Sequence, residues 1–220
     1  AASGESKSEV ASFAATVLSH LGEVRGDRVA LLAGDSGRLR RRPARAGSGH
    51  LELIVRDVER AFDPDAPAGD LTRLLDQVLR TQTRRSLVAV ITDEARPSEA
   101  DARALARVRT RHEVMVIQVA DADPFAAELT AGAPGRIAGA SSALARARKV
   151  VAVKGGAARD IETGRTLPPY LRGRAKLRGS VAQAREERHA ATVARMRSLG
   201  IESVVVEGTD DVIDEVVALL

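Results

Sequence analysis

Two short, almost continuous apolar runs constrain the fold of this chain most: LVAVI at residues 87–91 and VMVIQVA at residues 114–120. Strands with one face in water alternate apolar and polar residues, whereas strands covered on both faces are apolar almost throughout. Between the two runs, apolar residues follow helical spacing at Ala102, Leu105, Ala106 and Val108. Strands that alternate with helices in this way indicate an α/β protein with a mostly parallel sheet.

The same alternation extends on both sides of these runs. Apolar periodicity predicts further helices over about 7–22, 49–62 and 178–199, and another that begins near Asp70. Ser6 and Glu9 have the spacing of a capping box at the start of the first helix. Short strands are predicted at 27–33 and 202–208, and Asp210 or Asp211 is predicted to cap a last helix.

An arginine-rich segment, RLRRRPA at 38–44, follows the strand predicted at 27–33 and a tight turn at 34–37. Proline and several charges are typical of an edge strand, so the two segments are predicted to form an antiparallel hairpin. The patch of arginines is formed by Arg38, Arg40, Arg41, Arg42 and Arg45. It is either a solvated, charge-protected edge or a binding surface for an acidic protein, an anionic lipid or nucleic acid.

The pattern weakens from about 121 to 178 and returns with the charged helix predicted at 178–199. Short helices are expected at 125–130 and 141–148, a strand at 149–155, and a surface hairpin or loop after it. We expect residues 1–220 to form a single domain with an irregular insertion at about 121–178. The segment REER at 185–188 is predicted to lie on a solvent face with helical i, i+3 and i+4 charge pairs.

Composition excludes several classes of protein and site. The chain has no cysteine, so disulfides and thiolate metal sites are absent, and no apolar run approaches the roughly 20 residues of a membrane span. The net charge is only +4, and the sequence pI of about 10.1 reflects heavy use of arginine, which is typical of a GC-rich bacterial genome. Aromatic residues are 2%, too few to stack the bases of a single strand.

The order of several segments carries a resemblance: RGDRVALLA, AGDLTRLLDQVLR, RRSLVAVITDE, DIETGR and REERHAATVARMRSLGIESVVVEGTDD. Together they resemble the carboxyl-terminal domain of the bacterial "domain of unknown function 58" proteins, which is von Willebrand factor A-like. The resemblance implies a Rossmann-like three-layer fold of strand order 3-2-1-4-5-6 with an antiparallel edge strand. It also implies a central strand, ending in Asp-x-Ser-x-Ser, before the first helix, so we expect the sequence to be a fragment.

Von Willebrand A-like domains bind a divalent ion at the carboxyl ends of their strands, and the resemblance assigns Asp93 to the third ligand loop. The second loop lies at 68–71, where Gly69 replaces the usual threonine and Asp70 follows. A weak Mg²⁺ or Mn²⁺ site at Asp93 and Asp70 is therefore implied, with no organic cofactor. The alternative is structural: Asp93 is a helix-capping or loop carboxylate, and Asp70 is the N-cap of the next helix.

The resemblance suggests a non-catalytic protein-interaction module, an adaptor that works with a MoxR-type AAA+ ATPase. One alternative is a basic nucleic-acid or anionic-surface binder that uses the edge from Arg38 to Arg45. Another is a metal-dependent hydrolase, although the sequence supplies no evident nucleophile or general base. The expected location is cytoplasmic, with membrane attachment, if any, through segments outside this sequence.

Overall fold

The computed structural model describes residues 5–61, 69–94, 97–121 and 175–219, and side chains within 175–178 are not included. The helices and strand predicted at 125–130, 141–148 and 149–155 lie outside these ranges. The chain divides into two compact units, one of residues 1–122 and 184–220 and one of residues 123–183. Of the second unit, only residues 175–183, at the start of one helix, are described.

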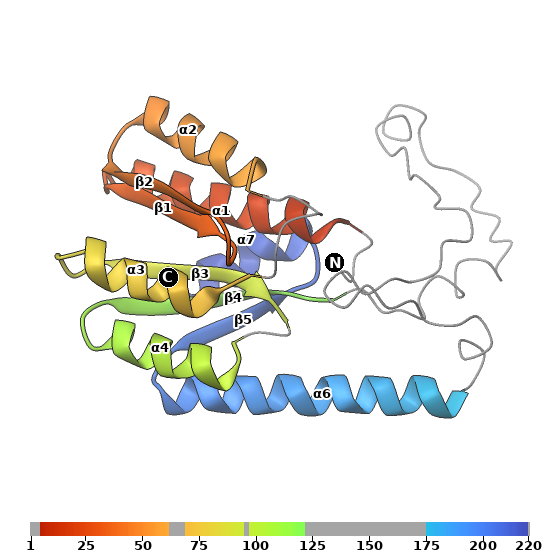
Figure 1. Ribbon diagram of the computed structural model, residues 1–220. Helices are drawn as coiled ribbons and strands as arrows, with labels where there is room; N and C mark the ends of the chain where they lie inside the picture. Colours follow the sequence, from red (N-terminus) through yellow and green to blue (C-terminus); the bar gives the residue numbers. More distant parts are fainter. Residues whose placement is uncertain (1–4, 62–68, 95–96, 122–174, 220) are drawn as a thin grey trace, which may run out of the picture. The chain divides into compact units, whose positions relative to one another are not determined.

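The described residues form a mixed α/β structure whose elements follow the predicted order (Figure 1). The helices are α1 (Lys7–Val24), α2 (Ser48–Glu59), α3 (Leu71–Thr81), α4 (Glu99–Arg109), α6 (Ala175–Ser198) and α7 (Thr209–Ala218). The strands are β1 (Val29–Gly34), β2 (Leu39–Arg45), β3 (Leu87–Asp93), β4 (Glu113–Val119) and β5 (Glu202–Val206). None of the helices in the described part of the chain has the length and apolarity that a membrane span requires.

Strands β3, β4 and β5 form a parallel sheet in that order, which confirms the parallel arrangement predicted from the apolar runs. The middle strand, β4, is buried at six of its seven positions. Its alternate side chains enter opposite cores, with Val114 and Val116 on one face and Ile117 and Val119 on the other. A strand buried on both faces needs the unbroken apolar sequence that residues 114–117 supply.

Helices cover both faces of this sheet, so the arrangement has three layers (Figure 1). On one face, α3, α4 and the end of α6 pack through Leu75, Leu105 and Met196, all at most 2% exposed. On the other face, α1 and α7 pack through Val10 and Val212, neither of which is exposed. These two cores fix the positions of the helix starts and strand ends that form the carboxyl edge of the sheet.

Strands β1 and β2 form a separate antiparallel hairpin, as predicted. The pairing shifts between Val29 and Leu31, where Pro43 and Ala44 together lie opposite a single residue of β1. An extra residue in one strand is a β-bulge, and proline in a sheet is confined to edges and bulges. The sequence thus placed the edge strand correctly, but the bulge changes which face each arginine occupies.

Helix ends follow local sequence in most cases. The capping box of Ser6 and Glu9 is present, and a second one joins Ser98 to Asp101 at the start of α4. The prediction that Asp210 or Asp211 caps α7 is wrong, because the N-cap is Gly208, which has no side chain to accept a hydrogen bond. The backbone N–H of Thr209 instead donates to Glu5 Oε2 at 2.9 Å, a contact that sequence spacing cannot reveal.

Candidate functional site

The carboxyl edge of the parallel sheet is the first candidate site. Asp93 is the last residue of β3 and lies opposite Val119, at the end of β4. Val119 in turn lies opposite Val206, the last residue of β5, so the three strands end together. Open α/β sheets bind their ligands outside this edge. The acidic residues that gather here are therefore the ones to examine for a ligand site.

Asp93 does not cap the helix that follows it. The N-cap of α4 is Ser98, whose hydroxyl accepts a hydrogen bond from the backbone N–H of Asp101 at 3.2 Å. Asp93 is the last residue of β3, and it is half-buried. The sequence left two structural roles for Asp93, a helix cap or a loop carboxylate, and the structure excludes the helix cap.

Asp70 is the N-cap of α3, as the structural alternative for this residue predicted. Its Oδ1 accepts a hydrogen bond from the backbone N–H of Arg73 at 2.9 Å. A carboxylate in this position also interacts favourably with the positive end of the helix dipole. Gly69, the preceding residue, has no side-chain oxygen. The loop at 68–71 therefore offers one carboxylate, that of Asp70, and it is already bonded to the first turn of α3.

Asp101 is the most buried carboxylate described at this end of the molecule, at 1% exposure, and sequence reasoning missed it. Its Oδ2 accepts from the hydroxyl of Ser98 at 2.7 Å and from its backbone N–H at 3.0 Å. Its Oδ1 accepts from the hydroxyl of Thr72, in the first turn of α3, at 2.9 Å. One carboxylate thus completes the capping box of α4 and ties the start of α3 to it. The Ser-x-x-Asp spacing could have indicated the cap, but not the contact with Thr72.

Glu94 is the centre of a second polar cluster at the same edge. The Nε and Nη2 atoms of Arg185, on α6, lie 3.0 and 2.8 Å from its carboxylate oxygens. The backbone N–H of Asp121, just after β4, donates to Glu94 Oε2 at 3.0 Å. Burial alone would raise the pKa of Glu94, but these hydrogen bonds outweigh it and hold the pKa below 4.5.

This ion pair corrects the prediction for one residue of the charged helix, whereas Glu186, Glu187 and Arg188 are exposed as predicted. Arg185 is the first residue of the REER segment that was predicted to lie on a solvent face. Its side chain is only 32% exposed and that of Glu94 is 10% exposed, so the pair is largely shielded from water. The partner lies 91 residues away in sequence, which is why helical i, i+3 and i+4 spacing gave no sign of it.

The start of α1 completes this edge. Lys7 forms an ion pair with Asp121, in the segment after β4. Glu5 accepts from both the backbone N–H and the hydroxyl of Thr209, at 2.9 and 2.7 Å, and so joins the chain before α1 to the start of α7. The acidic residues of the edge thus connect neighbouring segments to one another.

These contacts decide how well the described residues fit a divalent ion. Mg²⁺ takes about six oxygen ligands in near-octahedral geometry. Within the described ranges, no three His, Asp or Glu side chains gather closely enough to hold a metal ion. Asp70 is engaged at its helix, and Gly69 contributes no side-chain oxygen. The described residues therefore do not assemble a metal site, and the assignment of Asp93 and Asp70 as ligands stays a prediction.

The five arginines predicted to bind a partner do not form one surface. The register pairs Arg40 with Ala33, Arg42 with Leu31 and Arg45 with Val29, so these three share the face that α2 covers. Arg41 pairs with Leu32, whose side chain packs against the core of α3 and α4 on the opposite face. Arg38 lies in the turn before β2. The bulge brings Arg45 to the side of Arg42, which strict alternation does not predict.

Arg42 is neutralised by a neighbouring helix. It forms a hydrogen-bonded ion pair with Asp57 of α2, and their side chains are 33% and 14% exposed. The hydrogen bond from Arg42 outweighs the effect of burial and lowers the pKa of Asp57. Arg42 therefore holds α2 against the hairpin, whereas Arg38, Arg40, Arg41 and Arg45 remain exposed.

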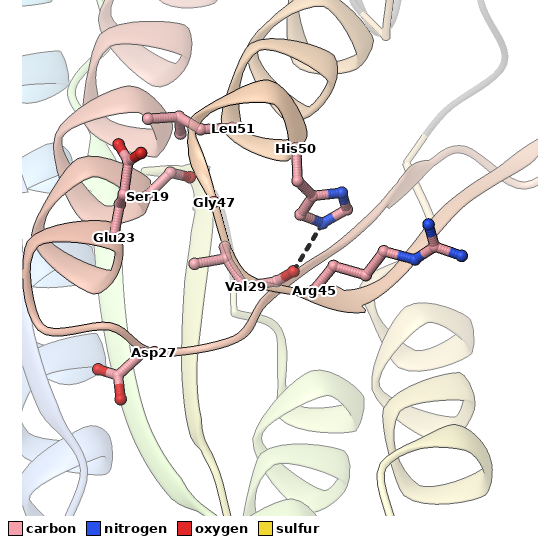
Figure 2. A pocket seen from close by; sticks show the side chains of 8 residues that line it. All are labelled: Ser19, Glu23, Asp27, Val29, Arg45, Gly47, His50 and Leu51. Atoms are coloured by element: carbon pink, nitrogen blue, oxygen red, sulfur yellow. Dashed lines mark hydrogen bonds between the residues drawn. The ribbon is translucent and has the colours of Figure 1, made fainter.

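A small hollow of about 180 Å³ lies between α1, the hairpin and the start of α2 (Figure 2). Glu23 and Asp27 line one side, and Arg45 and His50 line the other. His50 Nε2 lies 2.9 Å from the carbonyl oxygen of Val29, which can only accept, so this nitrogen carries the proton. No hydrogen bond among the described residues joins His50 to Ser19 of the same hollow, so the two do not form a base–nucleophile pair.

The chain resembles proteins whose functions are unknown. The family described as "Protein of unknown function DUF58" matches residues 2–145. Uncharacterized proteins of Mycobacterium tuberculosis and Mycobacterium bovis are each 33% identical to it over 118 residues. That alignment covers 52% of this chain and 36% of each relative, so this chain accounts for well under half of their length. No solved structure is significantly similar to the chain.

Proposed function

This chain belongs to the DUF58 family, and from that premise we propose that it is a non-catalytic protein-interaction module with a von Willebrand factor A-type fold. Three observations support the fold: a parallel sheet covered on both faces, an antiparallel strand β2 outside β1, and an α/β element order. The described strands form two sheets, β2-β1 and β3-β4-β5. The proposed fold has one more strand, between β1 and β3, that joins them.

The observation that carries the proposal is how the polar side chains are used. At the carboxyl edge, Glu94, Asp70 and Asp101 each accept hydrogen bonds that hold a helix or a neighbouring segment in place. Groups committed to the scaffold in this way are poorly placed to take up protons or substrates. On the hairpin, by contrast, Arg40 and Arg45 are exposed. Such a distribution supports binding through the surface more than chemistry at the strand ends.

We propose a MoxR-type AAA+ ATPase as the partner, with this domain as the adaptor that brings substrates to it. The proposal rests on the family resemblance, and the relatives' printed names do not mention a partner. The test uses a purified MoxR-type AAA+ ATPase from the same organism, with this chain and with the complete natural protein. Binding by biolayer interferometry and a change in ATP hydrolysis are expected. Absence of both with the complete protein would refute the partnership.

The second candidate function is an anionic-surface or nucleic-acid binder. The exposed arginines on and beside β2 favour it, since Arg binds phosphate well. A mobility shift with duplex DNA at two salt concentrations discriminates it, because phosphate contacts weaken steeply as salt rises. Strong, salt-sensitive DNA binding would replace the adaptor proposal. Weak binding at low salt alone would be the ordinary behaviour of a basic patch.

A further inference from the structure

A hollow of about 270 Å³ lies at the turn of the β1-β2 hairpin, beside the end of α2. Three arginines line it: Arg38 in the turn, Arg40 in β2 and Arg60 just after α2. Arg60 comes from a different element, and nothing in the arginine-rich segment of the sequence pointed to it. The remaining lining residues are Gly34, Asp35 and Ala61.

The turn beneath this hollow is held in a fixed shape. The backbone at Gly34 passes so close to Arg38 that an added Cβ would lie 2.2 Å from its carbonyl oxygen, so only glycine fits. The backbone N–H of Asp35 donates to the same carbonyl oxygen at 3.0 Å. From α3, Arg73 Nη1 donates to the carbonyl oxygen of Ser36 at 2.6 Å. The arginines around the turn therefore start from a preorganised backbone.

The described acidic groups near the hollow, Asp35 and Asp57, are already engaged. The carboxylate of Asp35 accepts the backbone N–H groups of Gly37 and Arg38, both at 2.7 Å, and these bonds lower its pKa. Asp57, whose charge also acts on Arg40 and Arg60, is bonded to Arg42. The side chains of Arg40 and Arg60 are exposed, and neither forms a hydrogen bond or ion pair with another described residue. Among the described residues, the guanidinium groups of Arg40 and Arg60 thus have no bonded carboxylate.

We propose that this hollow, formed by Arg38, Arg40 and Arg60, is the docking site for an acidic segment of a protein partner. Guanidinium groups bind carboxylates through paired hydrogen bonds of matching geometry, which ammonium groups cannot reproduce. The inference deepens the proposed interaction function and rests on it.

The layout favours a carboxylate-bearing protein over nucleic acid. A phosphate backbone gains affinity from a continuous line of cations. Here that line is interrupted, because Arg42 is paired with Asp57 and Arg41 lies on the other face. Recognition by side chains is also favoured over strand addition, since Pro43 and the bulge disrupt the edge that an added strand would need.

The experiment measures binding of a fluorescein-labelled peptide of alternating glutamate and serine to the full chain by fluorescence anisotropy. The test variant is Arg40→Glu/Arg60→Glu. Its matched control is Arg84→Glu/Arg85→Glu, which makes the same charge change at exposed arginines between α3 and β3. We expect the test variant to weaken binding by about tenfold or more, the loss that follows when charge-assisted hydrogen bonds are removed, and the control by much less. All the changed side chains are exposed, and equal melting temperatures verify that the fold is kept.

Equal losses in the two variants, or no binding by the unchanged chain, would overturn the site. Tighter binding of duplex DNA or of phosphatidylglycerol vesicles, lost in the Arg40→Glu/Arg60→Glu variant, would overturn the ligand class. Capture of the AAA+ ATPase is measured separately with the complete protein. ATPase capture without peptide binding refutes the hollow alone, whereas peptide binding without ATPase capture refutes only the proposed partner.

Discussion

Replacing Asp101 with alanine tests most directly whether the acidic residues of the carboxyl edge hold the fold together. The carboxylate is 1% exposed and accepts three hydrogen bonds, from the hydroxyl of Thr72 and from the hydroxyl and backbone N–H of Ser98. It therefore acts on two helices at once. Its removal should weaken the start of α4 and the contact between α3 and α4.

The magnitude follows from the groups that lose their partner. Loss of a helix cap costs about 1 kcal/mol, and a buried donor left without an acceptor costs about 1–3 kcal/mol. Removal of a buried charge offsets part of this cost, because the carboxylate no longer has to be desolvated. We expect Asp101→Ala to lower the free energy of unfolding by about 2–4 kcal/mol.

Urea unfolding followed by circular dichroism measures this change, provided that the m-value is unaltered. The matched control is Asp76→Ala. Asp76 also joins α3 to α4, through a 2.6 Å contact with Arg107, but the two side chains are 41% and 57% exposed. An exposed ion pair contributes about 0–1 kcal/mol. The two variants thus remove the same type of side chain between the same helices and differ mainly in burial.

A double-mutant cycle isolates the contact between α3 and α4. Thr72→Val removes the hydroxyl that donates to Asp101 and keeps the shape of the side chain. If the hydrogen bond matters, the combined loss will be smaller than the sum of the single losses by about 0.5–3 kcal/mol. Additive losses, or a cost of Asp76→Ala equal to that of Asp101→Ala, would refute the argument from burial and hydrogen bonding.

Glu94→Gln should lower the free energy of unfolding by about 1–3 kcal/mol at pH 7. The loss should be much smaller in acid, because the lowered pKa of Glu94 stabilises the folded state only until the pH falls through that pKa. Equal losses at pH 7 and pH 3 in urea unfolding would contradict this prediction. Burial and nearby Arg111 hold the pKa of His112 below its usual value of 6.5, so the folded state loses stability as the pH drops from 6.5 toward the folded pKa. His112→Leu should therefore flatten the dependence of the free energy of unfolding on pH between pH 7.5 and pH 5.5. An unchanged dependence would exclude His112 as its cause. If the metal hypothesis is correct and the dissociation constant is about 1 mM, 10 mM Mg²⁺ should raise the free energy of unfolding by about 1.4 kcal/mol. Asp93→Ala should abolish this gain. A melting temperature of the complete protein that neither Mg²⁺ nor Mn²⁺ changes would refute the hypothesis.

Most of the described fold could be predicted because its signals are local. The apolar runs of β3 and β4, the helical periodicity around Leu105 and the capping box at Ser6 each depend on residues close in sequence. Proline and arginine likewise indicated that β2 is an edge strand. Where a local signal was absent, prediction failed: Gly208 begins α7 with a cap supplied by Glu5, 204 residues away.

The site was harder to predict because its side chains meet across the fold. The resemblance directed attention to Asp93 and Asp70, and the structure shows Asp70 as a helix cap. Asp101 is 1% exposed and the side chain of Glu94 is 10% exposed, and both accept several hydrogen bonds, yet their partners Thr72 and Arg185 lie 29 and 91 residues away. The arginines show the same limit, since one bulge decides that Arg45 shares a face with Arg42.

This arrangement changes how substitutions at the carboxyl edge have to be interpreted. Topology makes that edge the place where an α/β sheet binds ligands, and the same edge is where Glu94 holds α6 and Asp101 joins α3 to α4. A variant of either residue that loses partner binding could do so by loosening a helix rather than by removing a contact with the partner. Within the described residues, the side chains of Arg40 and Arg60 form no such bonds, so their substitution separates binding from stability in a way that the carboxyl edge does not permit.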